Sequence, residues 1–206
     1  MPIANRIAHA EGGRSVRRDG FAEPSDAAVA MTRLTLHGVA LYAEGSLPTP
    51  GQEAPRFSLA NAALQDVGLD HFGRCLKLLH TVPSLELPSC AASALQCEEQ
   101  LRAWPDVALL VVSADLPFRR RPGACGSRRA VELSSFRSPS FARAYGVDIV
   151  SGPLKGLLAP ALLVLDERHR VLHAQLVREI SAAPDLAPAL AAVRGAAARD
   201  GATPVA

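Results

Sequence analysis

The sequence contains very little lysine and few aromatic residues. Of its 22 basic residues only Lys77 and Lys155 are lysine, and Phe, Trp and Tyr together make up 4% of the 206 residues. The net charge is only +2, which is too small to indicate a nucleic-acid partner. The preference for arginine, together with the abundant alanine, is typical of a GC-rich coding sequence rather than of a basic binding surface.

Long apolar runs are also absent. No run approaches the roughly 18 residues that a membrane span requires. The N-terminus lacks the apolar core of a secretory signal, and Arg17-Arg18 is not followed by one. These absences predict a cytoplasmic protein. In that compartment, four cysteines are more typical of free, catalytic or redox-active thiols than of structural disulfides.

The hydrophobic pattern divides the chain into three parts. Residues 1–32 have mixed charge and no periodicity, which predicts a disordered extension, and Met31 is a candidate for the true start. Residues 33–195 have the composition of one folded domain, and residues 196–206 form a flexible Ala/Gly tail.

Within the folded part, strand and helix patterns alternate. The expected strands are 34–36 and 39–42, joined as a hairpin, then 57–59, 75–82, 107–112, 130–133, 161–165 and 171–177, with 64–72 a strand or loop. The expected helices are 91–104, 139–145 and 184–193, the last ended by Gly195. This order predicts an α/β thioredoxin-like fold, with a central mixed sheet flanked by helices and an N-terminal β-hairpin.

The stretch that organises the chain is residues 83–93, Pro-Ser-Leu-Glu-Leu-Pro-Ser-Cys-Ala-Ala-Ser. An apolar strand leads into a loop bracketed by Pro83 and Pro88, which delivers Cys90 to the start of a helix. Backbone amides and the positive end of the helix dipole favour a thiolate there. We interpret Cys90 as a reactive thiol, although a small, inert, buried thiol is the alternative.

A second cysteine, Cys125, lies in a basic loop that follows the next buried strand. A core has no need of a thiol in that loop, so we interpret Cys125 as the working partner of Cys90. Cys75 and Cys97 fit core positions, and Cys97 is a possible alternative disulfide partner. His80, at the end of the strand before the loop, is either a base or a hydrogen-bonded structural histidine.

Several further segments resemble the bacterial thiol peroxidase branch of the peroxiredoxins. They are Cys90-Ala-Ala-Ser, Val112-Ser-Ala-Asp-Leu-Pro-Phe, Cys125-Gly, Leu133-Ser-Ser-Phe-Arg, Ala144-Tyr-Gly-Val and Gly152-Pro-Leu-Lys-Gly-Leu. The resemblance extends from about residue 34 to 193. It implies a peroxiredoxin of the atypical two-cysteine kind, a thiol-dependent enzyme that reduces hydrogen peroxide and organic hydroperoxides.

The resemblance also implies residue roles and partners. Cys90 matches the peroxidatic cysteine, Cys125 matches the resolving cysteine, and Pro83 matches the proline that shapes the loop and shields the sulfenic acid. Thioredoxin is the implied reductant, and a homodimer is the implied assembly. No metal or organic cofactor is implied, and no Cys/His spacing in the sequence is typical of a zinc site.

Two positions depart from the family pattern. Leu87 stands where the family has a threonine, and Pro160 appears where it has an arginine. Neither replacement supplies a hydrogen-bond donor or a charge. Candidates to replace the hydroxyl are Ser84 and Ser89, and candidates to replace the charge are Arg128, Arg129 and Arg137. The departures leave open an alternative function, a dithiol/disulfide sensor, reductase or binding protein without efficient peroxidase activity.

Overall fold

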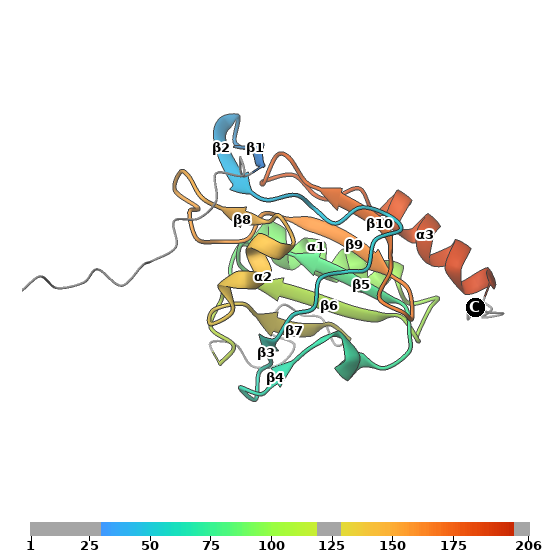
Figure 1. Cartoon of the computed structure of the whole chain (residues 1–206). Coiled ribbons are helices and arrows are strands. Elements are labelled where there is room, and N and C mark those ends of the chain that lie inside the picture. The colour runs from blue at the N-terminus through green and yellow to red at the C-terminus, as the bar shows by residue number, and fades with distance from the viewer. Residues whose placement is uncertain (1–29, 119–128, 200–206) are drawn as a thin grey trace, which may run out of the picture.

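The computed structural model describes residues 30–118 and 129–199 (Figure 1). Cys125, Arg128 and the predicted tails before residue 30 and after residue 199 lie outside the described residues. Within the described part, a seven-stranded sheet has the order β10-β9-β5-β6-β7-β3-β4. A second, three-stranded sheet has the order β1-β2-β8.

The larger sheet is mixed, as predicted. It contains β3 (Leu59–Ala60), β4 (Asp66–Val67), β5 (Lys77–Thr81), β6 (Ala108–Ser113), β7 (Val131–Ser134), β9 (Ala161–Leu165) and β10 (Val171–Leu176). Strands β5, β6 and β7 are parallel, whereas β9 is antiparallel to both β5 and β10. The smaller sheet contains β1 (Met31–Leu36), β2 (Val39–Glu44) and β8 (Asp148–Ile149), so the predicted N-terminal hairpin is confirmed.

Helices cover both faces of the larger sheet (Figure 1). On one face, α1 (Pro88–Gln100) packs against β6 and α3 (Leu186–Arg199) packs against β9 and β10, and Leu78, Ala94 and Val193 belong to the core that they enclose. On the other face, α2 (Pro139–Ala144) and the β1–β2 hairpin enclose a second core that contains Leu79. Neighbouring residues of β5 thus point into opposite cores, which explains why all five residues of this strand are buried, including the polar Lys77, His80 and Thr81.

Several predicted boundaries were wrong. Helix α1 begins at Pro88, three residues before the predicted start, and therefore contains Cys90 in its first turn. Helix α3 continues through Gly195 to Arg199. A glycine inside a helix costs about 1 kcal/mol relative to alanine, but Ala196 and Ala197 are buried against the sheet, which favours continuing the helix. The sequence pattern also missed the short β8.

Glu179 fastens the β1–β2 hairpin to the segment after β10. Its carboxylate accepts hydrogen bonds from the Thr35 hydroxyl at 2.7 Å and from the His37 and Gly38 amides at 2.9 and 3.3 Å. Ser181 donates its amide and its hydroxyl to the same carboxylate. Hydrogen bonds from Ser181, Thr35 and His37 hold the pKa of Glu179 at about 2.

We expect Glu179→Gln to loosen the hairpin. Because the folded-state pKa is lowered, the stabilising effect of the carboxylate is present above about pH 4.5 and is lost as the pH falls toward about 2. Amide hydrogen exchange at His37 and Gly38 should therefore accelerate in the variant at neutral pH, and in the parent only at acid pH. Glu167→Gln, in the exposed β9–β10 turn, is the control. Unchanged exchange in Glu179→Gln would show that the carboxylate does not hold the hairpin.

Candidate active site

Cys90 lies in the first turn of α1, which follows β5 along the chain after the loop of residues 82–87. Pro88 opens the helix, where the missing proline N–H costs nothing, and Leu87 is the N-cap residue without a side-chain hydrogen bond. The Cys90 and Ala91 amides both donate to the Leu87 carbonyl at 3.0 Å. Only 5% of the Cys90 surface is exposed, so this residue is packed against the core, although Leu87, Pro88 and Ser89 just before it are exposed.

Burial controls the acidity of this thiol. Removal from water raises the pKa of Cys90 above its ordinary value, and the negative charge of Asp115 raises it further. The Ser84 backbone and the Ser89 hydroxyl hydrogen-bond the sulfur and oppose this shift. A helix N-terminus is worth about 0.3–1 kcal/mol to an anion, less than one pKa unit, whereas burial shifts a pKa by up to about 3–5 units. The net pKa of Cys90 is therefore raised, because burial outweighs the hydrogen bonds that favour the thiolate.

Asp115 anchors the loop that carries Cys90. Its carboxylate accepts hydrogen bonds from the Ser84 hydroxyl at 2.6 Å, the Leu85 amide at 2.8 Å and the Ser113 hydroxyl at 2.9 Å. The loop is thereby tied to the end of β6. Pro83 is buried at the start of this loop, next to Val82, whose amide donates to the Val112 carbonyl at 2.9 Å.

The side chains predicted as possible replacements for the family's threonine and arginine differ in position. Of the two serines, Ser89 offers its hydroxyl to the sulfur, whereas the Ser84 hydroxyl is bonded to Asp115. Arg129 donates to the carbonyls of Leu101, Trp104, Pro105 and Val107, beyond the C-terminal end of α1.

Arg137 binds Asp66 at 2.7 Å and the Leu64 carbonyl at 2.9 Å, near β4. The hydrogen bonds of Arg129 and Arg137 therefore hold neither guanidinium at Cys90. Leu87 is 38% exposed at the N-cap, and Pro160 immediately precedes β9.

The other described cysteines have different environments. Cys97 is completely buried in α1, and burial raises its pKa to about 12, so its predicted place in the core is confirmed. Cys75 precedes β5 and is only partly buried, and its thiol donates to the Phe72 carbonyl at 3.2 Å. The prediction of a buried strand position for Cys75 was therefore wrong. The pairing of Cys90 with Cys125 stays a prediction.

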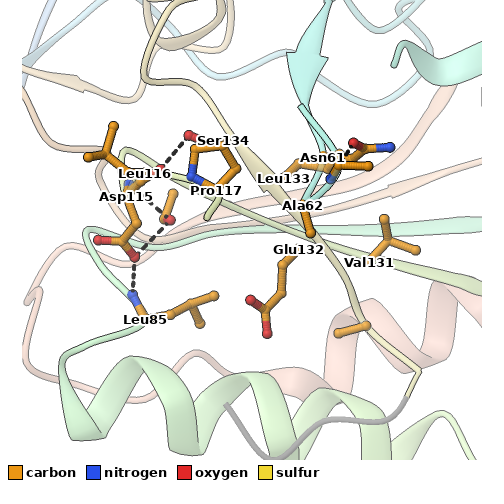
Figure 2. Close-up of a pocket in the computed structure, with 13 residues that line it drawn as sticks. Asn61, Ala62, Leu85, Asp115, Leu116, Pro117, Val131, Glu132, Leu133 and Ser134 are labelled. Atoms are coloured by element: carbon orange, nitrogen blue, oxygen red, sulfur yellow. Dashed lines mark hydrogen bonds between the residues drawn. The ribbon is translucent and has the colours of Figure 1, made fainter. Parts of the chain in front are cut away.

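A pocket of about 290 Å³ lies beside the Cys90 loop (Figure 2). Leu85 and Asp115 form the side next to the loop, and Asn61, Val131 and Glu132 belong to the other sides. Cys90 is not one of the lining residues. The pocket is therefore lined by Leu85 of the loop that carries Cys90 and by Asp115, which anchors that loop, and not by the thiol itself.

The sequence alone did not predict a role for Asp115. The available signal was the pattern Ser113-Ala-Asp115 directly after a buried strand, because short polar side chains there hydrogen-bond neighbouring backbone. In Figure 2, Asp115 reaches Leu85. Its carboxylate also accepts a hydrogen bond from the Ser113 hydroxyl.

The described residues contain neither a cluster of metal-ligating side chains nor a helix that could span a membrane. No group of three or more His, Cys, Asp or Glu side chains in residues 30–118 and 129–199 is placed to hold a metal ion. In the same residues, no helix is both long enough and apolar enough to cross a membrane.

Comparisons with known proteins agree with this geometry. The Redoxin family matches residues 49–191. A thiol peroxidase of Leptospira interrogans is 36% identical over 170 residues, which cover 81% of this chain and 99% of that protein. A peroxiredoxin-like protein from Aquifex aeolicus has a TM-score of 0.73 at 28% identity, over 80% of this chain and 98% of that one.

A thiol peroxidase from Chromobacterium violaceum shares the fold, with a TM-score of 0.76 at 23% identity, over 81% of this chain and 98% of that one. The Redoxin match and the Leptospira relative each extend over more than two thirds of the chain and include the Cys90 loop. The chain therefore belongs to the redoxin family, as a peroxiredoxin homologous to bacterial thiol peroxidases.

Proposed function

We propose that this protein is a cytoplasmic thiol peroxidase in which Cys90 attacks hydrogen peroxide and organic hydroperoxides. Cys125 resolves the oxidised Cys90, and thioredoxin reduces the resulting disulfide. The working protein is a homodimer. The observation that carries the proposal is a cysteine in the first turn of α1, with hydrogen bonds from Ser84 and Ser89 to its sulfur, in a chain of the redoxin family.

The reaction has three balanced steps. The Cys90 thiol first releases its proton, and the thiolate sulfur then attacks the terminal peroxide oxygen, which stays bonded to its hydrogen. The O–O bond breaks, and the leaving oxygen takes up one proton, which balances the proton released by the thiol, to give an alcohol or water and a Cys90 sulfenic acid. The Cys125 thiol then attacks the Cys90 sulfur, which forms an S–S bond and releases water. A thioredoxin dithiol reduces this bond by exchange and leaves as a disulfide.

A second function is favoured by one observation. Burial and Asp115 both raise the pKa of Cys90, while Leu87 and Pro160 provide neither a donor nor a charge to stabilise the anion. A thiol that is mostly protonated at neutral pH is a poor nucleophile. A dithiol sensor or binding protein, which exchanges disulfides but reduces peroxide slowly, is therefore the alternative.

The first prediction concerns Cys90 itself. Stopped-flow mixing of the reduced protein with hydrogen peroxide or cumene hydroperoxide should show oxidation faster than that of a free thiol, and Cys90→Ser should abolish it. Cys75→Ser, which removes a partly exposed thiol away from the α1 start, is the matched control and should keep the parent rate. A Cys90-dependent rate no faster than a free thiol would favour the dithiol function instead.

The second prediction follows from the raised pKa of Cys90. The thiolate fraction grows about tenfold per pH unit below the pKa, so alkylation of Cys90 by iodoacetamide should still accelerate above about pH 8.5, the ordinary thiol pKa. The rate is measured by mass spectrometry of the Cys90 peptide across pH 6–10 (roughly the span around that value). A plateau reached below pH 7 would mean that a cation reaches the sulfur in the folded protein.

The third prediction restores a hydroxyl at the helix start. In Leu87→Thr, the side-chain oxygen can accept from the Cys90 amide at the third helical position, while its O–H points toward the sulfur. We expect α1 to gain about 1 kcal/mol of stability. Peroxide oxidation of Cys90 should accelerate at least about tenfold, since one preorganised donor is typically worth ~10²–10³ in rate.

Leu87→Val is the matched control for this substitution, because valine has the shape of threonine without the hydroxyl. Thermal unfolding and stopped-flow oxidation are measured for both variants. Equal oxidation rates in the two variants would show that position 87 contributes no donor to the reaction.

A further inference from the structure

His80 connects the start of β9 to the first turn of α1. It lies on the face of β5 that packs against α1 and is completely buried. Its Nδ1 is 3.1 Å from the Ala161 carbonyl oxygen, and its Nε2 is 2.8 Å from the Ser93 hydroxyl oxygen. The predicted hydrogen-bonded histidine is thus confirmed, and both ring nitrogens are engaged.

Ser93 continues this connection to Cys90. It lies about one helical turn after Cys90, is 6% exposed, and directs its hydroxyl to the Cys90 carbonyl oxygen at 2.9 Å. Polar contacts therefore run without interruption from β9 through His80 and Ser93 to the backbone of the reactive cysteine. Both ends of this series are carbonyl oxygens, which only accept hydrogen bonds.

The protons available to these contacts can be counted. Three contacts join Ala161, His80, Ser93 and Cys90, but a neutral imidazole and one hydroxyl supply only two protons. The Ala161 carbonyl requires the proton on Nδ1, so Nε2 accepts from Ser93. The single Ser93 hydroxyl proton is then shared between Nε2 and the Cys90 carbonyl. Loss of either side chain therefore changes the hydrogen bonding of the other.

A comparison with His173 shows that burial alone does not create such a link. Within the described residues, Nε2 of His173 in β10 is buried and has no hydrogen-bond partner. By contrast, His80 joins two elements that meet at Cys90. Its β9 contact, Ala161, directly follows Pro160, the position where the family resemblance places an arginine.

We propose that His80 is a positioning residue for the Cys90 reaction, acting through Ser93. The pair holds the Cys90 backbone against β9, which keeps the sulfur beside the Ser84 backbone and the Ser89 hydroxyl. Asp115 holds the other side of the same loop through Ser84 and Leu85. The inference rests on the proposed function only in taking Cys90 as the reacting thiol.

The test uses two substitutions of equal shape, Ser93→Thr and Ser93→Val, in the full-length protein. Both add the same bulk at a buried position, and only threonine keeps the hydroxyl. The rate constant of Cys90 oxidation by hydrogen peroxide should fall roughly two- to tenfold further in Ser93→Val than in Ser93→Thr, the range that one hydrogen bond accounts for. Equal rate constants in the two variants would overturn the proposal.

The link through His80 is tested by a double-mutant cycle. His80→Asn retains an N–H near the position of Nδ1, and hence the bond to Ala161, but cannot reach Ser93. Alone it should slow Cys90 oxidation by a factor similar to that of Ser93→Val. Combined with Ser93→Val it should cause little further loss, because both changes break one series of contacts. Multiplying losses would mean that His80 and Ser93 act independently.

Two further measurements serve as controls. One distinguishes a positioning role of His80 from a general loss of protein stability, and the other distinguishes failure of this proposal from failure of the proposed function. The control is His173→Asn, at a partly buried histidine outside this series, and it should leave the rate constant unchanged even if it lowers the melting temperature. Alkylation of Cys90 by iodoacetamide is recorded for all variants. If the parent proves to be no peroxidase, the same Thr–Val difference in alkylation still supports the positioning role, and its absence still overturns it.

Discussion

Burial of Cys90 is the constraint on which the rest of the site depends. A thiol that is 5% exposed loses most of its hydration. The free energy needed to ionise it there is larger than the stabilisation that a helix N-terminus gives to the anion. Every polar group around the sulfur therefore matters more than it would at the surface. Ser84 and Ser89 stabilise the anion directly, whereas Asp115 destabilises it while holding the loop in place. The site thus holds the Cys90 loop in a fixed position, while its burial and the Asp115 charge disfavour the thiolate.

Different parts of the molecule therefore control the position of Cys90 and its nucleophilicity. The mixed sheet, with β5 buried on both faces, provides the rigid platform, and the Asp115 bonds fix the loop to the end of β6. Such order favours proximity and orientation, which do not require a low thiol pKa. The nucleophilicity of Cys90 depends instead on donors and charges within a few ångströms of the sulfur. Two redoxin-family chains of the same fold can therefore differ widely in peroxidase rate.

The sequence allowed the fold class, the hairpin and the loop-to-helix position of Cys90 to be predicted, because these depend on hydrophobic periodicity and on proline and glycine placement. It did not predict the start of α1, since Leu87 offers no capping side chain to mark it. It did not predict that α3 passes through Gly195, because the burial of Ala196 and Ala197 is a tertiary effect. The role of Asp115 and the sign of the Cys90 pKa shift required the spatial arrangement, because both depend on groups far apart in the chain.

The sequence resemblance predicts that Leu87 and Pro160 stand where the family has a threonine and an arginine. Pro160 itself supplies no charge at the start of β9, and the adjoining Ala161 carbonyl has a hydrogen-bond partner in His80. That partner is neutral at physiological pH, because burial lowers the pKa of His80 to about 4. It can orient the Cys90 turn, but it cannot hold a negative charge on the sulfur. In the proposed reaction, His80 and Asp115 therefore anchor the Cys90 turn, and activation of the thiol depends on the Ser89 hydroxyl and the Ser84 backbone.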